Sequence, residues 1–259
     1  MRRGFTLIEI VVVMAIIVVL ASLLLPVFTS SKQAAYKTAA LTQMRQLGIA
    51  STLYQTEWDD KLVPSTNYGF DDAEPEKVWT NLLFPYVKDR KIFIAPSTFG
   101  QFVFDYRNRG WASIGMNLST AIDTRNGCRE LQKDKSGCQA FRTAAELEKS
   151  ENPSKVALFS ITPPGDTEMN YRGYEFSPFN GIPRNIGNVA EWPPLVSEKD
   201  LVEELFTVPG DYLKPLQAIY NPDGQGNGST PVVFADGHVK PYTANQIERG
   251  GTGIIWRIR

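Results

Sequence analysis

The sequence is poor in the residues that most enzymes and metal sites use. Its 259 residues include one histidine, His238, and two cysteines. It also lacks the nucleophile motif Gly-x-Ser-x-Gly, the zinc motif His-Glu-x-x-His and a phosphate-binding glycine loop. Pairs of carboxylates can hydrolyse glycosides, but nothing in the sequence marks out such a pair. We therefore predict that the protein is not an enzyme, and we interpret His238 as a residue on the face of a strand.

The sequence also lacks an excess of either charge. It contains 27 basic and 28 acidic residues, which are interspersed and give a formal net charge of −1. A protein that binds nucleic acid through bulk electrostatics carries a basic stretch or a clear positive excess. The sequence therefore gives no indication of a nucleic-acid partner.

One long stretch has no charged residue at all. Residues 10–31 consist mainly of Val, Ile, Leu and Ala, and about 20 apolar residues suffice for a helix to cross a bilayer. A single acid, Glu9, lies just inside the N-terminal edge of this stretch. A carboxylate at the edge of a membrane helix is costly, so we expect Glu9 to have a partner or a function.

The first nine residues, Met-Arg-Arg-Gly-Phe-Thr-Leu-Ile-Glu, resemble the processing signal of type IV pilins and type II secretion pseudopilins. In that family a prepilin peptidase cleaves after the glycine and methylates the new amino terminus. The resemblance implies cleavage after Gly4, N-methylation of Phe5 and a role in assembly for Glu9. It extends to Pro26, which stands where many members carry a proline in the first helix. Family members are bound to the membrane and assemble with copies of themselves or with other pilins and pseudopilins.

The resemblance implies a structural subunit of a type IV pilus or a type II secretion pseudopilus. An alternative is a minor or tip pilin whose C-terminal domain binds a ligand, a surface or DNA. A third interpretation is an anchored domain that does not assemble, for which replacement of Glu9 would have no effect.

Three simpler interpretations of the N-terminus are a secretory signal peptide, a plain membrane anchor and a buried helix of a soluble protein. A secretory signal peptide usually has an apolar stretch of only 7–15 residues and a small-x-small cleavage site, and neither fits this sequence. A plain anchor gives no reason for Glu9, and a buried helix of a soluble protein fits least well. Two arginines precede the apolar stretch, so the positive-inside rule places the rest of the chain outside the cytoplasm. We expect a bacterial inner-membrane protein with a single span and a periplasmic or extracellular C-terminal domain.

Four segments are predicted along the chain. They are a leader at residues 1–4, a membrane or filament-core helix at 5–30, its amphipathic continuation at 31–60 and a globular domain at 61–259. The continuation has an apolar stripe in steps of three and four residues, which comprises Ala40, Met44, Leu47, Ser51, Tyr54 and Trp58. We expect one helix of about 50 residues that ends near Trp58, with a kink or local melting at Pro26.

The domain is predicted to have an α+β fold, in which the long helix packs against a mainly antiparallel sheet. A short helix is expected at residues 78–86, and strands are expected at 91–94, 112–116 and 156–161. The clearest local pattern is a hairpin with strands at 231–235 and 238–242. Asp236 and Gly237 separate these strands, and Asp-Gly is typical of a two-residue type I′ turn.

A second resemblance, to large pilin-like proteins, rests on three segments. They are Met-Arg-Gln-Leu-Gly at residues 44–48, Asn-Pro-Ser-Lys at 152–155 and Phe-Ala-Asp-Gly-His-Val at 234–239. That group usually carries a histidine ten residues before the Asp-Gly pair. Here that position is Gly226.

Two further features concern residues 127–138 and 223–228. Cys128 and Cys138 lie in a polar stretch and predict a disulfide if the compartment is oxidising, with two free thiols as the alternative. In the second segment Asp223, Gln225 and Asn227 alternate before a glycine, as at the start of a calcium loop, although Phe234 occupies the place of the later bidentate acid. Both a Ca²⁺ site and a glycine-rich turn remain open for this segment, and no other cofactor is expected.

Overall fold

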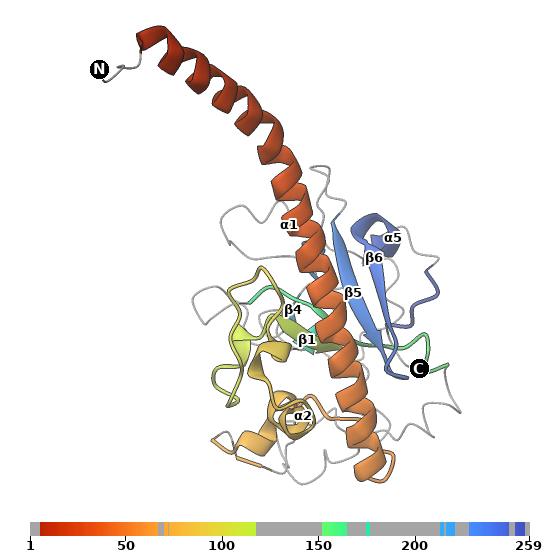
Figure 1. The fold of residues 1–259 in the computed structure, drawn as a ribbon. Helices are drawn as coiled ribbons and strands as arrows, with labels where there is room; N and C mark the ends of the chain where they lie inside the picture. Colours follow the sequence, from red (N-terminus) through yellow and green to blue (C-terminus); the bar gives the residue numbers. More distant parts are fainter. Residues whose placement is uncertain are drawn as a thin grey trace.

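The long N-terminal helix dominates the architecture. The computed structural model describes residues 6–66, 70–71, 73–117, 152–164, 175–176, 213–214, 216–220, 228–248 and 252–256. Helix α1 (Leu7–Glu57) has 51 residues and is therefore about 77 Å long at 1.5 Å per residue. Its C-terminal half lies along the globular part, and its N-terminal half projects away from it (Figure 1).

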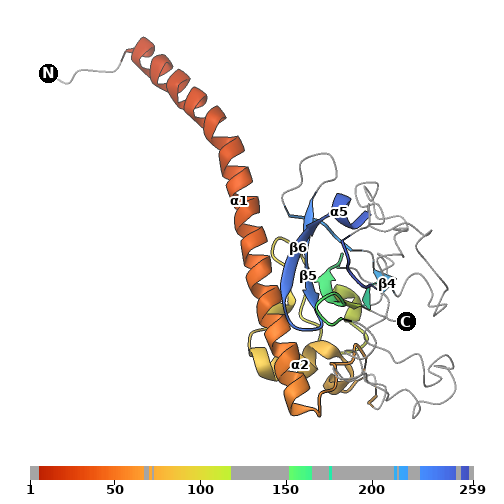
Figure 2. The same ribbon diagram turned by 90° about the vertical axis from the view of Figure 1, so that its right-hand side faces the viewer.

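The predicted single helix is confirmed, with its C-cap at Trp58. The predicted local melting at Pro26 is wrong, because the helix is continuous through this residue. Pro26 lacks one backbone donor, but the hydrogen bonds on either side maintain the helix. Figure 2 shows α1 as a smoothly curved helix rather than a broken one.

The C-terminal half of α1 packs on the domain through the predicted apolar stripe. Ala40, Met44, Leu47, Ser51 and Tyr54 are all buried, so this part of the prediction is confirmed. Trp58 differs, because half of its surface is exposed and its ring stacks on that of Tyr54 with 5.6 Å between ring centroids. The helix ends there, so the helical periodicity no longer determines where the side chain points.

The sheet has the strand order β4-β3-β1-β2-β5-β6. Four strands form its antiparallel part: β1 (Ile114–Asn117), β2 (Ala157–Ile161), β5 (Ser229–Phe234) and β6 (Val239–Thr243). Two short strands, β3 (Glu175–Phe176) and β4 (Leu213–Lys214), extend the sheet in parallel beside β1. The α+β fold with a mainly antiparallel sheet is therefore confirmed.

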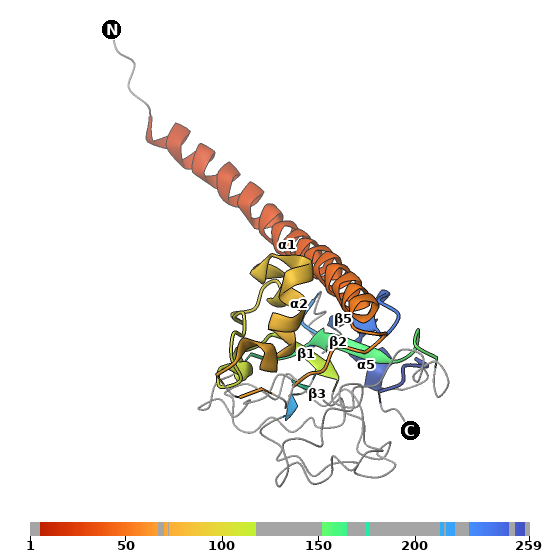
Figure 3. The ribbon, with the colours of Figure 1, turned by 90° about the horizontal axis from the view of Figure 1, so that it is seen from below.

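Both faces of the sheet are covered. Val233 packs into the larger core together with Met44 and Leu47 of α1. Its neighbours Val232 and Phe234 face the other side, where α5 (Ala244–Glu248) contributes Ile247 to a second cluster. Successive side chains of a strand point to opposite faces, so β5 is buried on both. Figure 3 shows α1 and α5 on different sides of the strands.

The remaining helices belong to the segment between α1 and β1. Helix α2 (Trp79–Val87) confirms the predicted short helix. Three 3₁₀ turns accompany it: η1 (Pro75–Lys77), η2 (Arg90–Phe93) and η3 (Arg109–Trp111). The strand predicted at residues 91–94 is therefore wrong. The Asp89 side chain accepts a hydrogen bond from the Lys91 N–H and caps the turn, whereas an apolar run of this length does not distinguish a strand from a helical turn.

The β5–β6 hairpin is confirmed, but its predicted turn type is wrong. The Gly237 N–H donates to Phe234 O at 2.9 Å, and the Phe234 N–H donates to His238 O at 2.9 Å. These bonds enclose a three-residue loop in which only Gly237 has a positive φ, of 85°. A type I′ turn needs two positive φ values, whereas three-residue loops typically end with one glycine in this region.

A lysine is buried at the short edge strand β4. The Lys214 side chain is fully buried, and its Nζ donates to the carbonyl oxygens of Gly110 at 2.5 Å and Ala112 at 2.6 Å. Burial lowers the pKa of this amine, because removal from water disfavours the charged form. The amine links β4 to η3 and to the residue that follows it.

We expect Lys214→Met to destabilise the protein by about 1–3 kcal/mol, because two buried carbonyl groups then lose a donor. Chemical denaturation of the full chain in detergent measures the change. Lys240→Met is the matched control, since Lys240 lies exposed on β6 and its loss should change the stability by less than about 0.5 kcal/mol. Equal stabilities of the two variants would contradict a structural role for Lys214.

Candidate functional site

The N-terminal half of α1 exposes an apolar surface on all sides. Residues 6–32 are all exposed, and none of the apolar window of the helix is buried within the protein. Within the described residues, α1 is the one helix whose length and composition suffice to cross a membrane. A buried helix of a soluble protein would pack against its own domain, so the structure does not support that interpretation.

Glu9 lies in the first turn of this apolar helix. Its Oε2 accepts hydrogen bonds from the Thr6 backbone N–H at 2.8 Å and from the Thr6 hydroxyl at 2.7 Å. In return, the Glu9 N–H donates to Thr6 Oγ1 at 3.4 Å. Together these bonds form a capping box, which satisfies backbone donors at the start of a helix. The same glutamate also places a negative charge where the positive end of the helix dipole favours it.

The two residues that precede this cap, Gly4 and Phe5, lie outside the described residues. Within the described residues, Oε1 of Glu9 makes no hydrogen bond, so this oxygen can accept one from a cation. An amine that approaches the helix start would complete a charge-assisted pair with it. The arrangement thus provides an anionic site at one end of an otherwise apolar surface.

The residues of the predicted disulfide and calcium site also lie outside the described residues. They are the cysteines Cys128 and Cys138 and the candidate calcium ligands Asp223, Gln225 and Asn227. Elsewhere, across the part of the chain that the structure describes, no group of three or more His, Cys, Asp and Glu residues is arranged to hold a metal ion. The disulfide and the calcium loop stay predictions.

Two segments of the second resemblance, residues 44–48 and 234–239, meet where α1 crosses the β5–β6 hairpin. The third, residues 152–155, leads directly to Val156, whose carbonyl oxygen accepts from the Ala235 N–H at 2.9 Å. A Cβ atom added to Gly48 would lie only 2.3 Å from the carbonyl oxygen of Gly237. A Cβ atom on Gly237 would lie 2.9 Å from Thr52 Oγ1. The helix and the turn approach so closely that two glycines face each other, and we call this the Gly48–Gly237 contact.

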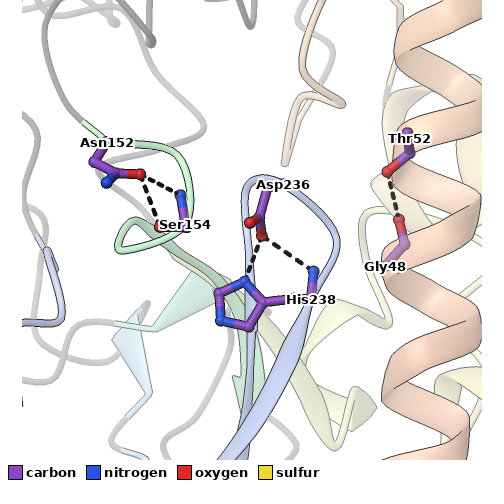
Figure 4. A network of polar contacts seen from close by, with 6 residues as sticks. All are labelled: Gly48, Thr52, Asn152, Ser154, Asp236 and His238. Atoms are coloured by element: carbon purple, nitrogen blue, oxygen red, sulfur yellow. Dashed lines mark hydrogen bonds and ion pairs between the residues drawn. The ribbon is translucent and has the colours of Figure 1, made fainter.

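Side-chain hydrogen bonds hold the loops around this contact (Figure 4). Asp236 Oδ1 accepts from the His238 N–H at 3.1 Å and lies 2.6 Å from His238 Nδ1. The His238 ring stacks parallel to that of Phe234, with 4.2 Å between centroids. Asn152 Oδ1 accepts from the N–H and the hydroxyl of Ser154, at 3.0 and 2.7 Å. His238 thus lies at the turn, immediately before β6, and helps to shape the loop.

The role of Gly48 was not predicted from the sequence. A glycine within a helix costs about 1 kcal/mol relative to alanine, and such a residue often marks a close contact. This signal was present, since Gly48 falls inside a regular apolar stripe. The identity of the partner, Gly237, is a matter of tertiary structure.

Comparison with known proteins agrees with the N-terminal features. The model of the prokaryotic N-terminal methylation motif matches residues 1–25. The chain is 41% identical over 96 residues to the type II secretion system core protein G of Escherichia coli strain K12. The aligned part covers 37% of this chain and 65% of that protein. No solved structure matches the chain.

The methylation motif extends over the first residues of α1, including Glu9 and its cap. The same helix has the apolar, exposed N-terminal half and the domain-packed C-terminal half described above. Together with the similarity to the secretion protein, these findings agree with the resemblance of the N-terminus to type IV pilins and pseudopilins.

Proposed function

We propose that the chain is a structural subunit of a type IV pilus or a type II secretion pseudopilus. It is cleaved after Gly4 by a prepilin peptidase, methylated at Phe5 and assembled through α1 with copies of itself or with other pilins. The observation that carries this proposal is the apolar half of α1. It is exposed on every side, and its one charged group is the carboxylate of Glu9 at its start.

The surface of this helix requires burial in an apolar environment. An exposed apolar patch of this extent does not persist in water, and a bilayer or a bundle of similar helices would cover it. Because Glu9 is charged, a bundle must supply a cation close to it. Cleavage after Gly4 creates an amine at Phe5, four residues before Glu9 in the sequence, and the same amine on a neighbouring subunit is a suitable partner.

The charges at the ends of the membrane segment support the proposed orientation. Arg2 and Arg3 precede the apolar stretch, which by the positive-inside rule favours a cytoplasmic N-terminus. The domain then lies on the periplasmic or extracellular side of the inner membrane. In this compartment Cys128 and Cys138 would form the proposed disulfide.

Replacement of Gly4 by leucine tests the processing step. A peptidase must approach the backbone closely, so a side chain at this position should block cleavage. We expect intact-mass spectrometry to show the wild-type chain without its first four residues and with one added methyl group, and the Gly4→Leu chain at its full unmodified mass. A wild-type chain that retains these four residues would refute the proposal.

A further inference from the structure

The charges of helix α1 change sign across its apolar stretch. The helix contains the charged residues Glu9, Lys32, Lys37, Arg45 and Glu57, so every charge between its first and last turns is positive. Lys32 follows the charge-free residues 10–31 directly. At 1.5 Å per residue these are about 33 Å long, which matches a hydrocarbon core of about 30 Å. When Glu9 lies at one boundary of the core, Lys32 therefore lies at the other, on the side of the domain.

The globular part begins close to this second boundary. Tyr36 is the first residue of α1 that packs against the larger core, and Ala40 is the first that is fully buried. Tyr36 lies five residues beyond Ser31, or about 7.5 Å along the helix, and the headgroup layer of one leaflet is about 5–8 Å thick. Figure 2 shows the domain beside the C-terminal half of α1, with bare helix beyond it. The domain thus meets the helix at the outer surface of the headgroup layer.

Two lysines and a tyrosine gather at this level, and we call Lys32, Tyr36 and Lys37 the boundary cluster. Lys32 Nζ lies 5.6 Å from the centroid of the Tyr36 ring. Lys32 is exposed and Lys37 is partly exposed, and within the described residues neither lysine forms an ion pair. Tyrosine is enriched where the headgroups begin, because its ring is apolar and its hydroxyl polar. Long lysine side chains reach the headgroups from such positions.

We propose that the boundary cluster binds the headgroups of anionic phospholipids in the leaflet next to the domain. This inference rests on the membrane span of the proposed function and goes beyond it by assigning a lipid ligand. Lipid phosphates supply the counter-charge that the two lysines lack within the described residues, and each basic side chain close to an anionic surface strengthens binding. Arg45 lies eight residues beyond Lys37, about 12 Å further along the helix, and is therefore outside the headgroup layer. The cluster fixes the depth of α1 and holds the domain against the membrane.

Lipid selectivity of the full chain in bilayers tests this inference. The chain is reconstituted in phosphatidylcholine, and electron paramagnetic resonance compares the association of spin-labelled phosphatidylglycerol and phosphatidylcholine with it. We expect the wild type to prefer phosphatidylglycerol, and Lys32→Gln combined with Lys37→Gln to lower this preference at least about twofold. Arg45→Gln is the matched control and should keep the wild-type preference. Arg2 and Arg3 are present in all of these chains, so the difference between them reports on the domain side.

The lipid measurement has several outcomes that would overturn the inference. An unchanged preference in the double variant would do so, as would an equal loss for Arg45→Gln. Excess inorganic phosphate at constant ionic strength should leave the preference unaltered, whereas its disappearance would reveal a site for free phosphate instead. A double variant with normal lipid preference but fewer filaments would show that the lysines pair with a neighbouring subunit. A wild-type chain that does not insert into bilayers would instead contradict the proposed function itself.

Discussion

Replacement of Glu9 by alanine is expected to abolish assembly while leaving membrane insertion intact. The helix start survives, because the Thr6 hydroxyl still accepts from the backbone N–H of residue 9. The proposed partner, the amine at Phe5 of a neighbouring subunit, would then be buried without a counter-charge. Removal of one member of a buried ion pair costs about 3–5 kcal/mol, which corresponds to a loss of more than about 100-fold in association. The yield of sheared filaments measures the loss, and membrane fractionation measures insertion.

Glu9→Gln separates the two roles of this side chain. Glutamine retains an oxygen that can accept from the Thr6 N–H and hydroxyl, so the capping box can form. It lacks the negative charge that the neighbouring amine requires. We expect Glu9→Gln to fail in assembly as Glu9→Ala does. If Glu9→Gln forms filaments at the wild-type level, Glu9 serves as a helix cap and not as a counter-charge.

The second large effect is expected at the Gly48–Gly237 contact. An alanine at position 48 would place its Cβ atom 2.3 Å from the Gly237 carbonyl oxygen, and a backbone atom cannot rotate away. Overpacking of this kind costs about 1–3 kcal/mol. Alanine in a helix interior is otherwise favoured over glycine by about 1 kcal/mol, so the two effects have opposite signs. We expect the steric effect to dominate, with a net loss of up to about 2 kcal/mol in the free energy of unfolding.

Gly237→Ala combines a contact with backbone strain. Its added Cβ atom would lie 2.9 Å from Thr52 Oγ1, and φ at this position is 85°. Gly253→Ala is the matched control, because Gly253 has a φ of 71° and no atom within 4 Å of the added Cβ. The Gly253→Ala chain should be destabilised only by the cost of placing alanine in a left-handed conformation, about 1–2 kcal/mol. Thermal unfolding of the full chains in detergent compares the stabilities of the three variants. A Gly48→Ala chain more stable than the wild type would show that the helix and hairpin separate readily.

The sequence predicted the long helix well because its signals are local. A 22-residue stretch without charge, followed by apolar residues in steps of three and four, specifies the helix from Leu7 to Glu57 and the side that packs. Strands β2 and β5 were also predicted, since each is a short apolar run bounded by turn residues. Asp-Gly correctly located the hairpin. It did not reveal that the loop has three residues, because this choice depends on the pairing of Phe234 with His238.

Other features depended on contacts between distant segments. The apolar residues 91–94 fit a strand as well as a 3₁₀ turn, and the Asp89 cap together with packing against the core selects the turn. The short parallel strands β3 and β4 have too few residues for a pattern. Nothing in the sequence distinguishes the buried Lys214 from an ordinary surface lysine. Its burial depends on the carbonyl oxygens of Gly110 and Ala112, which are distant in sequence.

By itself, the sequence determined that this chain has a membrane-compatible helix, with a single acid at its start and a motif there that resembles a processing signal. These properties follow from composition and from the spacing of neighbouring residues, which a linear pattern records. Only the tertiary structure decided that Gly48 meets Gly237 and that one side of the domain half of α1 remains uncovered. Such contacts depend on how the helix lies against the sheet, and this geometry results from the packing of the whole core.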